Sequence, residues 1–167
     1  ESVPDAAQLR DHWWLRSGWR PDTRMLSWYL TFEGETSLHE LARQAQAALA
    51  GIDVLDPVPP EWLHLSLAAF GATDDVTEDC VRQAINAAHE HIAVLGSLEL
   101  SFSQTVVFAE SVVLCPDDSP GLSALRAALV ESVRQVRGEG APADEGDFVP
   151  HMSVAYAHGP AAGADVV

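Results

Sequence analysis

The sequence predicts an α+β protein with two pseudo-symmetric β-α-β lobes, whose antiparallel sheets line a central cleft and whose helices lie outside. The chain has 167 residues and is 47% hydrophobic, which suits a single domain with a sizeable core. It also runs twice through the same order of elements: a strand, a helix and a strand containing His-x-Ser. These segments are 25–32, 38–50 and 62–70 in the first half, and 111–114, 120–137 and 149–156 in the second.

The elements of the first half are predicted from the spacing of apolar residues. Residues 25–32 alternate between polar and apolar side chains, as a half-buried strand does. Leucine and alanine recur at helical spacing over 38–50, after Thr36 or Ser37, either of which can cap the helix. A short strand or connector at 52–55 leads to the first His-x-Ser strand.

The second half comes after a longer helix, which Thr77 caps and which ends near Leu95. The third helix, 120–137, has Ser119 as its cap and a proline in its first position. Between these helices, short apolar runs predict three strands: 98–103, 105–109 and 111–114.

The two ends of the chain differ from the middle. Residues 1–24 hold four of the nine arginines and three of the five tryptophans. They predict an arm, either packed on the body through its tryptophans or acting as a lid with arginine near a phosphate. Residues 25–158 are expected to form one bilobal domain, and 159–167 a flexible tail.

The two His-x-Ser strands are the candidate active site. Side chains two apart on a strand point to the same face, so His64 shares a face with Ser66 and His151 shares one with Ser153. The apolar residues between them point the other way and can anchor each strand in a core. Each strand therefore presents an imidazole and a hydroxyl on one side.

The paired motifs His64-Leu65-Ser66-Leu67 and His151-Met152-Ser153-Val154 resemble the signature of the 2H phosphoesterase superfamily. That group contains the bacterial 2′-5′ RNA ligase-like proteins and cyclic phosphodiesterases, and the resemblance covers roughly residues 25 to 157. It implies that the two histidines act as general acid and base and that both serines hydrogen-bond phosphate oxygens. It also implies hydrolysis of 2′,3′-cyclic phosphates or 2′-5′ phosphodiesters of short RNA or nucleotides, with no metal and no cofactor.

Two alternatives to a hydrolase stay open: a reversible 2′-5′ RNA ligase, and a nucleotide- or RNA-end-binding module with little turnover. The second is motivated by a departure from the family pattern. Many members have arginine where this chain has Val149 and Tyr156. Tyr156 can donate a hydrogen bond to the substrate or only pack, since strict alternation puts it on the face opposite His151. Trp62 and Phe70 are expected on the His64 face, and with Tyr29 they are candidates for stacking on a base.

The net charge of −16 argues against a protein that tracks a long RNA, because phosphate contacts supply most non-specific affinity for nucleic acids. A small nucleotide or short RNA is the expected partner. No apolar run reaches the roughly 18 residues of a membrane span. With two cysteines and no visible leader, the chain is expected to be a cytoplasmic monomer.

Overall fold

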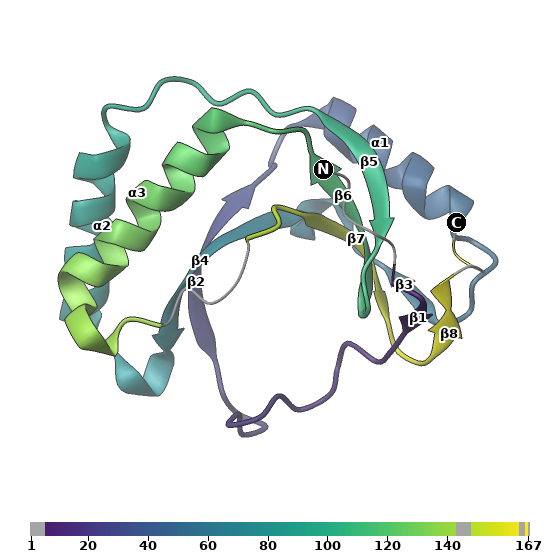
Figure 1. The fold of residues 1–167 in the computed structure, drawn as a ribbon, viewed down its shortest axis with the longest axis horizontal. Coiled ribbons are helices and arrows are strands. Elements are labelled where there is room, and N and C mark those ends of the chain that lie inside the picture. The colour runs from purple at the N-terminus through teal and green to yellow at the C-terminus, as the bar shows by residue number, and fades with distance from the viewer. Residues whose placement is uncertain (1–5, 143–147, 164–165, 167) are drawn as a thin grey trace.

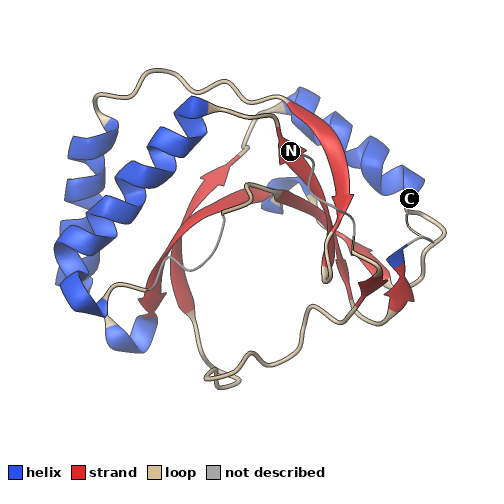
Figure 2. Cartoon of the chain, in the orientation of Figure 1, coloured by secondary structure: helices blue, strands red, loops and turns tan. Residues whose placement is uncertain are grey.

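A computed structural model describes residues 6–142, 148–163 and 166 (Figure 1). One curved antiparallel sheet forms an arch, and the helices lie on its outer side (Figure 2). The sheet contains, in spatial order, β2 (Met25–Thr31), β4 (His64–Ala72), β7 (Met152–Ala157), β6 (Ser111–Pro116) and β5 (Phe102–Val107). A sixth strand, β3 (Leu55–Pro57), pairs with β7. The predicted α+β class with antiparallel strands is confirmed.

The two motif strands occupy the centre of the sheet. β4 and β7 run antiparallel and meet at the pair Leu65 and Met152. Beyond this point they separate: β4 continues along β2, whereas β7 continues between β6 and β3. Leu65, Met152 and Val154 are completely buried, so the apolar faces of both strands anchor the core as expected.

Two of the helices cover strands that come from the other half of the chain. The helix α1 (Thr36–Ala48), from the first half, packs on β7. The helix α3 (Pro120–Arg137), from the second half, packs on β4 and against α2 (Glu78–Ile92). Figure 1 shows α2 and α3 together outside β4, with α1 on the opposite side of the arch.

The predicted caps are partly correct. The hydroxyls of Thr77 and Ser119 accept hydrogen bonds from backbone N–H groups in the first turns of α2 and α3. The prediction for α1 is wrong: Glu35 occupies the N-cap position without a side-chain hydrogen bond, and Thr36 is already helical. Three short 3₁₀ turns complete the described helical structure: Pro60–Trp62, Thr73–Asp75 and Gly138–Gly140.

A β-bulge in β4 overturns the predicted position of Phe70. The partners of β2 skip Leu67 and Phe70, so β4 carries extra residues at both places. The extra residue at Leu67 moves the alternation by one position, and Ala69 rather than Phe70 follows Ser66 to the exposed face. Phe70 is 4% exposed and packs against α2 and α3, so it offers no surface for stacking on a base.

A matching bulge lies in β7. Ser153 pairs with Val113 and Ala155 with Val112, which leaves Val154 as the extra residue. Val154 and Ala155 are both buried, and Tyr156 returns to the face of Ser153. Strict alternation placed Tyr156 on the opposite face, and this expectation is wrong for the same physical reason as in β4. Both motif strands therefore have a bulge at the residue that follows their serine.

The connections also differ from the sequence-based expectation. Two strands, not three, lie between α2 and α3, because residues 98–101 are irregular. The C-terminal segment is not a free tail where it is described: β8 (Ala161–Ala162) pairs with β1 (Gln8–Leu9) of the arm. Residues 164–165 and 167 lie outside the described part of the chain. No helix in the described ranges has the length and apolar character needed to cross a bilayer.

Candidate active site

The register between the motif strands brings the four predicted catalytic residues together. Because β4 and β7 are antiparallel through Leu65 and Met152, His64 lies alongside Ser153, and Ser66 lies alongside His151. Each histidine therefore has the serine of the other half as its neighbour across the strands. All four lie on the face of the sheet that points away from the buried Leu65 and Met152.

Both imidazoles are held by the same hydrogen bond. The Nδ1 atom of His64 lies 2.8 Å from the carbonyl oxygen of Trp62, and Nδ1 of His151 lies 2.8 Å from the carbonyl oxygen of Val149. A carbonyl oxygen only accepts, so Nδ1 carries the proton and donates. In the neutral ring, this leaves the Nε2 lone pair free in both histidines. No pattern in the sequence predicts these bonds.

An aromatic ring contacts each histidine. The ring centroid of Tyr29 lies 4.9 Å from that of His64 in an edge-on arrangement, and Phe108 lies 4.9 Å from His151 at a tilt of 57°. Tyr29 is the partner of Ser66 in the β2–β4 register, which places it on the catalytic face as predicted. Phe108 was not predicted, because it belongs to the β5–β6 turn and only the fold brings it to His151.

A cavity of about 350 Å³ opens beside His64. Trp62 is 70% exposed and Tyr29 is 49% exposed, so both rings of this cavity are available to a ligand. The remaining lining residues are Thr31, Glu61, Leu63 and His64. Of the predicted aromatic residues, Trp62 and Tyr29 are thus brought to the site and Phe70 is not.

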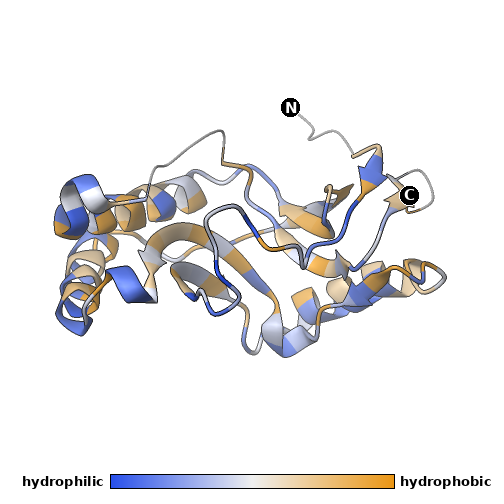
Figure 3. Cartoon of the chain, turned by 90° about the horizontal axis from the view of Figure 1, so that it is seen from below, coloured by the Kyte–Doolittle hydropathy of each residue, from blue (hydrophilic) through white to orange (hydrophobic). Residues whose placement is uncertain are grey.

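The N-terminal arm crosses the open side of the arch, opposite the helices (Figure 1, Figure 3). Its His12 stacks on Tyr156 with ring centroids 4.1 Å apart and planes inclined by 25°. Trp13 approaches the same tyrosine edge-on at 5.9 Å. One face of Tyr156 is therefore covered by the chain itself, which limits direct stacking of Tyr156 on a substrate.

Glu110, in the β5–β6 turn, holds the arm in place. Its Oε1 accepts hydrogen bonds from Nε1 of Trp14 at 2.7 Å and from Nε of Arg10 at 3.0 Å. Its Oε2 accepts from Nη2 of Arg16 at 3.1 Å. The indole of Trp14 also lies below both guanidinium groups, whose carbon atoms are 5.6 Å (Arg10) and 5.2 Å (Arg16) from its ring. We call these four residues the arm latch.

Two titratable groups around the latch have shifted pKa values. Burial alone would raise the pKa of Glu110, but the hydrogen bonds from Trp14 and Arg16 and the charge of Arg16 outweigh it and lower the pKa below its usual value. Burial, followed by the nearby charge of Arg16, lowers the pKa of His12, against the opposing effect of Glu110. The docked arm therefore favours an ionised Glu110 and a neutral His12.

Within the described ranges, no three His, Cys, Asp or Glu side chains lie together as metal ligands would. The site instead consists of two imidazoles with fixed Nδ1 protons, two hydroxyls and exposed aromatic rings. This set can accept one proton, donate another and hydrogen-bond an oxyanion.

The chain belongs to the 2′-5′ RNA ligase superfamily, whose family model matches residues 35–167. This match and the solved structures with the same fold confirm the resemblance to the 2H phosphoesterases. The family contains phosphoesterases and ligases. No curated protein matches the sequence.

Several solved structures share the fold. TT0787 of Thermus thermophilus is 22% identical, with a TM-score of 0.65 over 83% of this chain and 76% of its own. E. coli LigT complexed with 3′-AMP is 17% identical, with a TM-score of 0.60 over 83% of this chain and 73% of its own. The MHV ns2 PDE domain is 18% identical, with a TM-score of 0.60 over 83% of this chain and 84% of its own.

Proposed function

We propose that the protein is a metal-independent phosphoesterase that hydrolyses 2′,3′-cyclic phosphates or 2′-5′ phosphodiesters of short RNA or nucleotides. The observation that carries this proposal is the crossed arrangement of His64 with Ser153 and His151 with Ser66, with both Nδ1 atoms fixed by backbone carbonyls. Two equivalent imidazoles on one face provide the two proton transfers that phosphodiester hydrolysis requires.

In the proposed mechanism, water attacks the phosphorus atom, and the bond from phosphorus to one ribose oxygen breaks. Nε2 of one histidine takes a proton from the water, and Nε2 of the other, protonated histidine gives a proton to the departing oxygen. Ser66 and Ser153 donate hydrogen bonds to the non-bridging oxygens as negative charge grows there. The arrangement is nearly symmetric, so the same groups can exchange roles in the reverse reaction, ligation.

The cavity beside His64 suits a nucleobase attached to the reacting phosphate. Trp62 and Tyr29 offer exposed rings, and stacking on an aromatic ring is worth about 1–3 kcal/mol per base. LigT, which has the same fold, holds 3′-AMP in its structure. The net charge of −16 supports a short substrate, and we propose that the chain acts as a cytoplasmic monomer with its two free cysteines reduced.

A panel of 2′,3′-cyclic mononucleotides, with products followed by phosphorus NMR, tests this proposal. A hydrolase converts them to monophosphates of one regiochemistry. A ligase joins a cyclic-phosphate end to a 5′-hydroxyl oligonucleotide in the same assay, and a binding module shifts the resonances without forming product. Binding without any turnover would contradict the enzymatic proposal.

We expect activity to survive treatment with a chelator. The two imidazoles and two hydroxyls can perform both proton transfers and stabilise the oxyanion by themselves. The measurement is the initial rate on a 2′,3′-cyclic nucleotide before and after EDTA treatment and dialysis. A loss of rate that one divalent ion restores would overturn the metal-independent mechanism.

We propose that the arm supplies positive charge to the substrate, since Arg16 is bonded to Glu110, two residues after Phe108, the ring that contacts His151. Glu110→Gln should weaken the arm latch and raise KM by about 5-fold, because each partly exposed ion pair contributes about 0.2–1 kcal/mol. The kcat should change little. Glu131→Gln, at an exposed position on α3, is the matched control, and an unchanged KM in Glu110→Gln would leave the arm a structural role only.

Acidification should release the arm. The pKa of His12 is lowered in the docked arm, so a released His12 takes up a proton more readily than a docked one. As the pH falls below the ordinary pKa of 6.5, protonation of His12 therefore favours release of the arm. The pKa of Glu110 is also lowered in the docked arm. As the pH falls below its ordinary pKa of 4.5, protonation of Glu110 favours release further. Tryptophan fluorescence recorded between neutral and acid pH follows this release, and a Glu110→Gln variant should show it at higher pH.

A further inference from the structure

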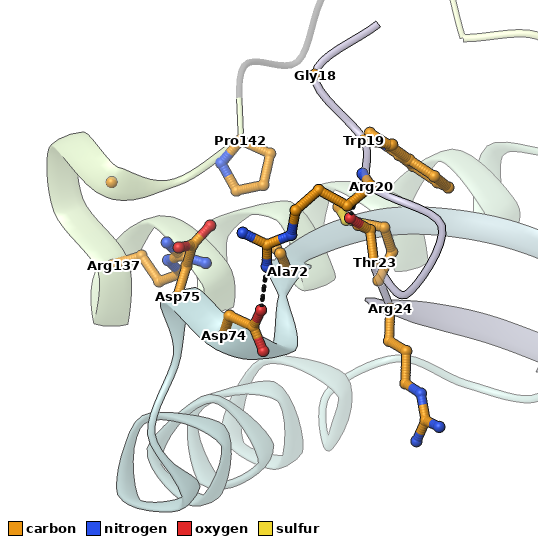
Figure 4. Close-up of a pocket in the computed structure, with 13 residues that line it drawn as sticks. Gly18, Trp19, Arg20, Thr23, Arg24, Ala72, Asp74, Asp75, Arg137 and Pro142 are labelled. Atoms are coloured by element: carbon orange, nitrogen blue, oxygen red, sulfur yellow. Dashed lines mark hydrogen bonds and ion pairs between the residues drawn. The ribbon is translucent and has the colours of Figure 1, made fainter. Parts of the chain in front are cut away.

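A second cavity, with charged residues in its lining, lies at the end of β4 farthest from His64. Its volume is about 460 Å³, and Gly71 and Ala72 of β4 are among the residues that line it. The arm supplies one wall with Trp19 and Arg20 (Figure 4). The 3₁₀ turn after β4 and the end of α3 supply the others. His64 and Ala72 are the two ends of the nine-residue strand β4, so about 26 Å separates them at the usual rise of a strand.

The guanidinium of Arg137 is fixed at the edge of this cavity. Its Nη1 donates to the carbonyl oxygen of Phe70 at 2.7 Å. A Cβ atom at Gly71 would collide with this Nη1, so the approach needs glycine, and Gly71 also has a φ of +136°, which favours glycine. A guanidinium has five N–H donors, and among the described residues the bond to Phe70 uses one of those of Arg137, which leaves the others for a ligand.

Three arginines and two aspartates line the cavity, and Figure 4 shows the side chain of Arg24 directed away from the other four. Arg20 forms an ion pair with Asp74 at 2.7 Å, which neutralises both groups (Figure 4). Asp75 and Arg137 line the same cavity, but neither forms an ion pair with another described residue. A carboxylate that accepts and a guanidinium that donates thus face one space without being bridged. This favours a neutral ligand with donors and acceptors side by side over a lone phosphate.

Trp19 adds a flat apolar surface at the rim of the cavity, where its side chain is 39% exposed. An indole face with hydrogen-bonding groups beside it is the usual environment of a nucleobase bound to protein. Arginine pairs with O6 and N7 of guanine, and a carboxylate accepts from an amino group of a base. Guanine presents both kinds of group on one ring system.

We propose that this cavity binds a guanine base, with Arg137 donating to its carbonyl edge, Asp75 accepting from its N–H groups and Trp19 stacking on its face. The base belongs either to a separate guanine nucleotide or to a distant nucleotide of the RNA whose phosphate reacts at His64 and His151. The second source rests on the function proposed above, and the first does not.

Calorimetry with GMP, AMP, CMP and inorganic phosphate tests the cavity in the double variant His64→Ala/His151→Ala, which removes the catalytic imidazoles. GMP should bind about 10-fold or more tightly than AMP and CMP. Asp75→Ala and Arg137→Gln should remove this preference. The exposed, ion-paired residues of α2 give matched controls, Asp79→Ala and Arg82→Gln, which should keep it.

Gly71→Ala provides an independent variant, because it displaces the guanidinium of Arg137 without changing the charge of the protein. Thermal unfolding of each variant establishes that it is folded before binding is measured. Equal affinity for all four ligands, a preference that survives in the folded Asp75 and Arg137 variants, or no binding would each overturn the proposal.

The source of the base is resolved with catalytically intact protein. Short RNAs ending in a 2′,3′-cyclic phosphate are compared with guanosine or adenosine at successive upstream positions. A gain of about 10-fold in kcat/KM at one position, lost in Asp75→Ala, assigns the base to the substrate. Binding of GMP without any positional preference assigns it to a separate nucleotide, and this outcome stands even if cyclic phosphates are not hydrolysed.

Discussion

His64→Ala and His151→Ala should each lower kcat by about 10²- to 10⁴-fold, the usual contribution of one general acid or base. The two losses should be similar, because each imidazole is fixed by an equivalent hydrogen bond to a backbone carbonyl and faces the serine of the other half. The double variant should lose less than the product of the two, since both groups act on one transition state.

The pH dependence of kcat/KM gives a second test of the histidine pair. We expect a bell-shaped profile in the wild type, with one limb for the base and one for the acid, and each single variant should lose one limb. His89→Ala, an exposed position on α2, is the matched control. Melting temperatures recorded on the same proteins separate catalysis from stability: a folded His64 or His151 variant with normal kcat would contradict the assignment.

Ser66→Ala and Ser153→Ala should each lower kcat by about 10- to 1000-fold, as expected for the loss of one hydrogen-bond donor to a developing negative charge. KM should change less than kcat, because this hydrogen bond strengthens as the transition state forms. Ser66→Thr and Ser153→Thr keep the hydroxyl and should restore most of the rate. An alanine variant that loses affinity alone, with kcat preserved, would assign the serine to ground-state binding.

Much of the site could be predicted because it depends on a short-range rule. The alternation of side chains along a strand puts His64 with Ser66 and His151 with Ser153, and the repeated order of elements indicates that the two strands pair. The helix ranges followed from apolar spacing for the same reason. What the rule needs is an uninterrupted strand, and it fails where a bulge interrupts one.

Phe70 and Tyr156 show that failure. Each lies beyond a bulge, and each was therefore placed on the wrong face. The extra residues at Leu67 and Val154 are ordinary apolar residues, so no local signal marks them. Contacts between distant segments were missed for a different reason: Phe108 reaches His151, and Glu110 holds the arm, only after the sheet has curved.

The packing of α1 on β7 and of α3 on β4 has a consequence for how the chain can assemble. β7 is shielded by a helix from the first half and β4 in part by a helix from the second, so an isolated half would leave apolar surface open to water. A half chain could bury that surface by exchanging its helix with a second copy, as in a domain-swapped dimer. The His-x-Ser strands of such a dimer would then meet at its two-fold axis. In the present chain, both motif strands thus depend on a helix from the other half to keep their apolar faces out of water.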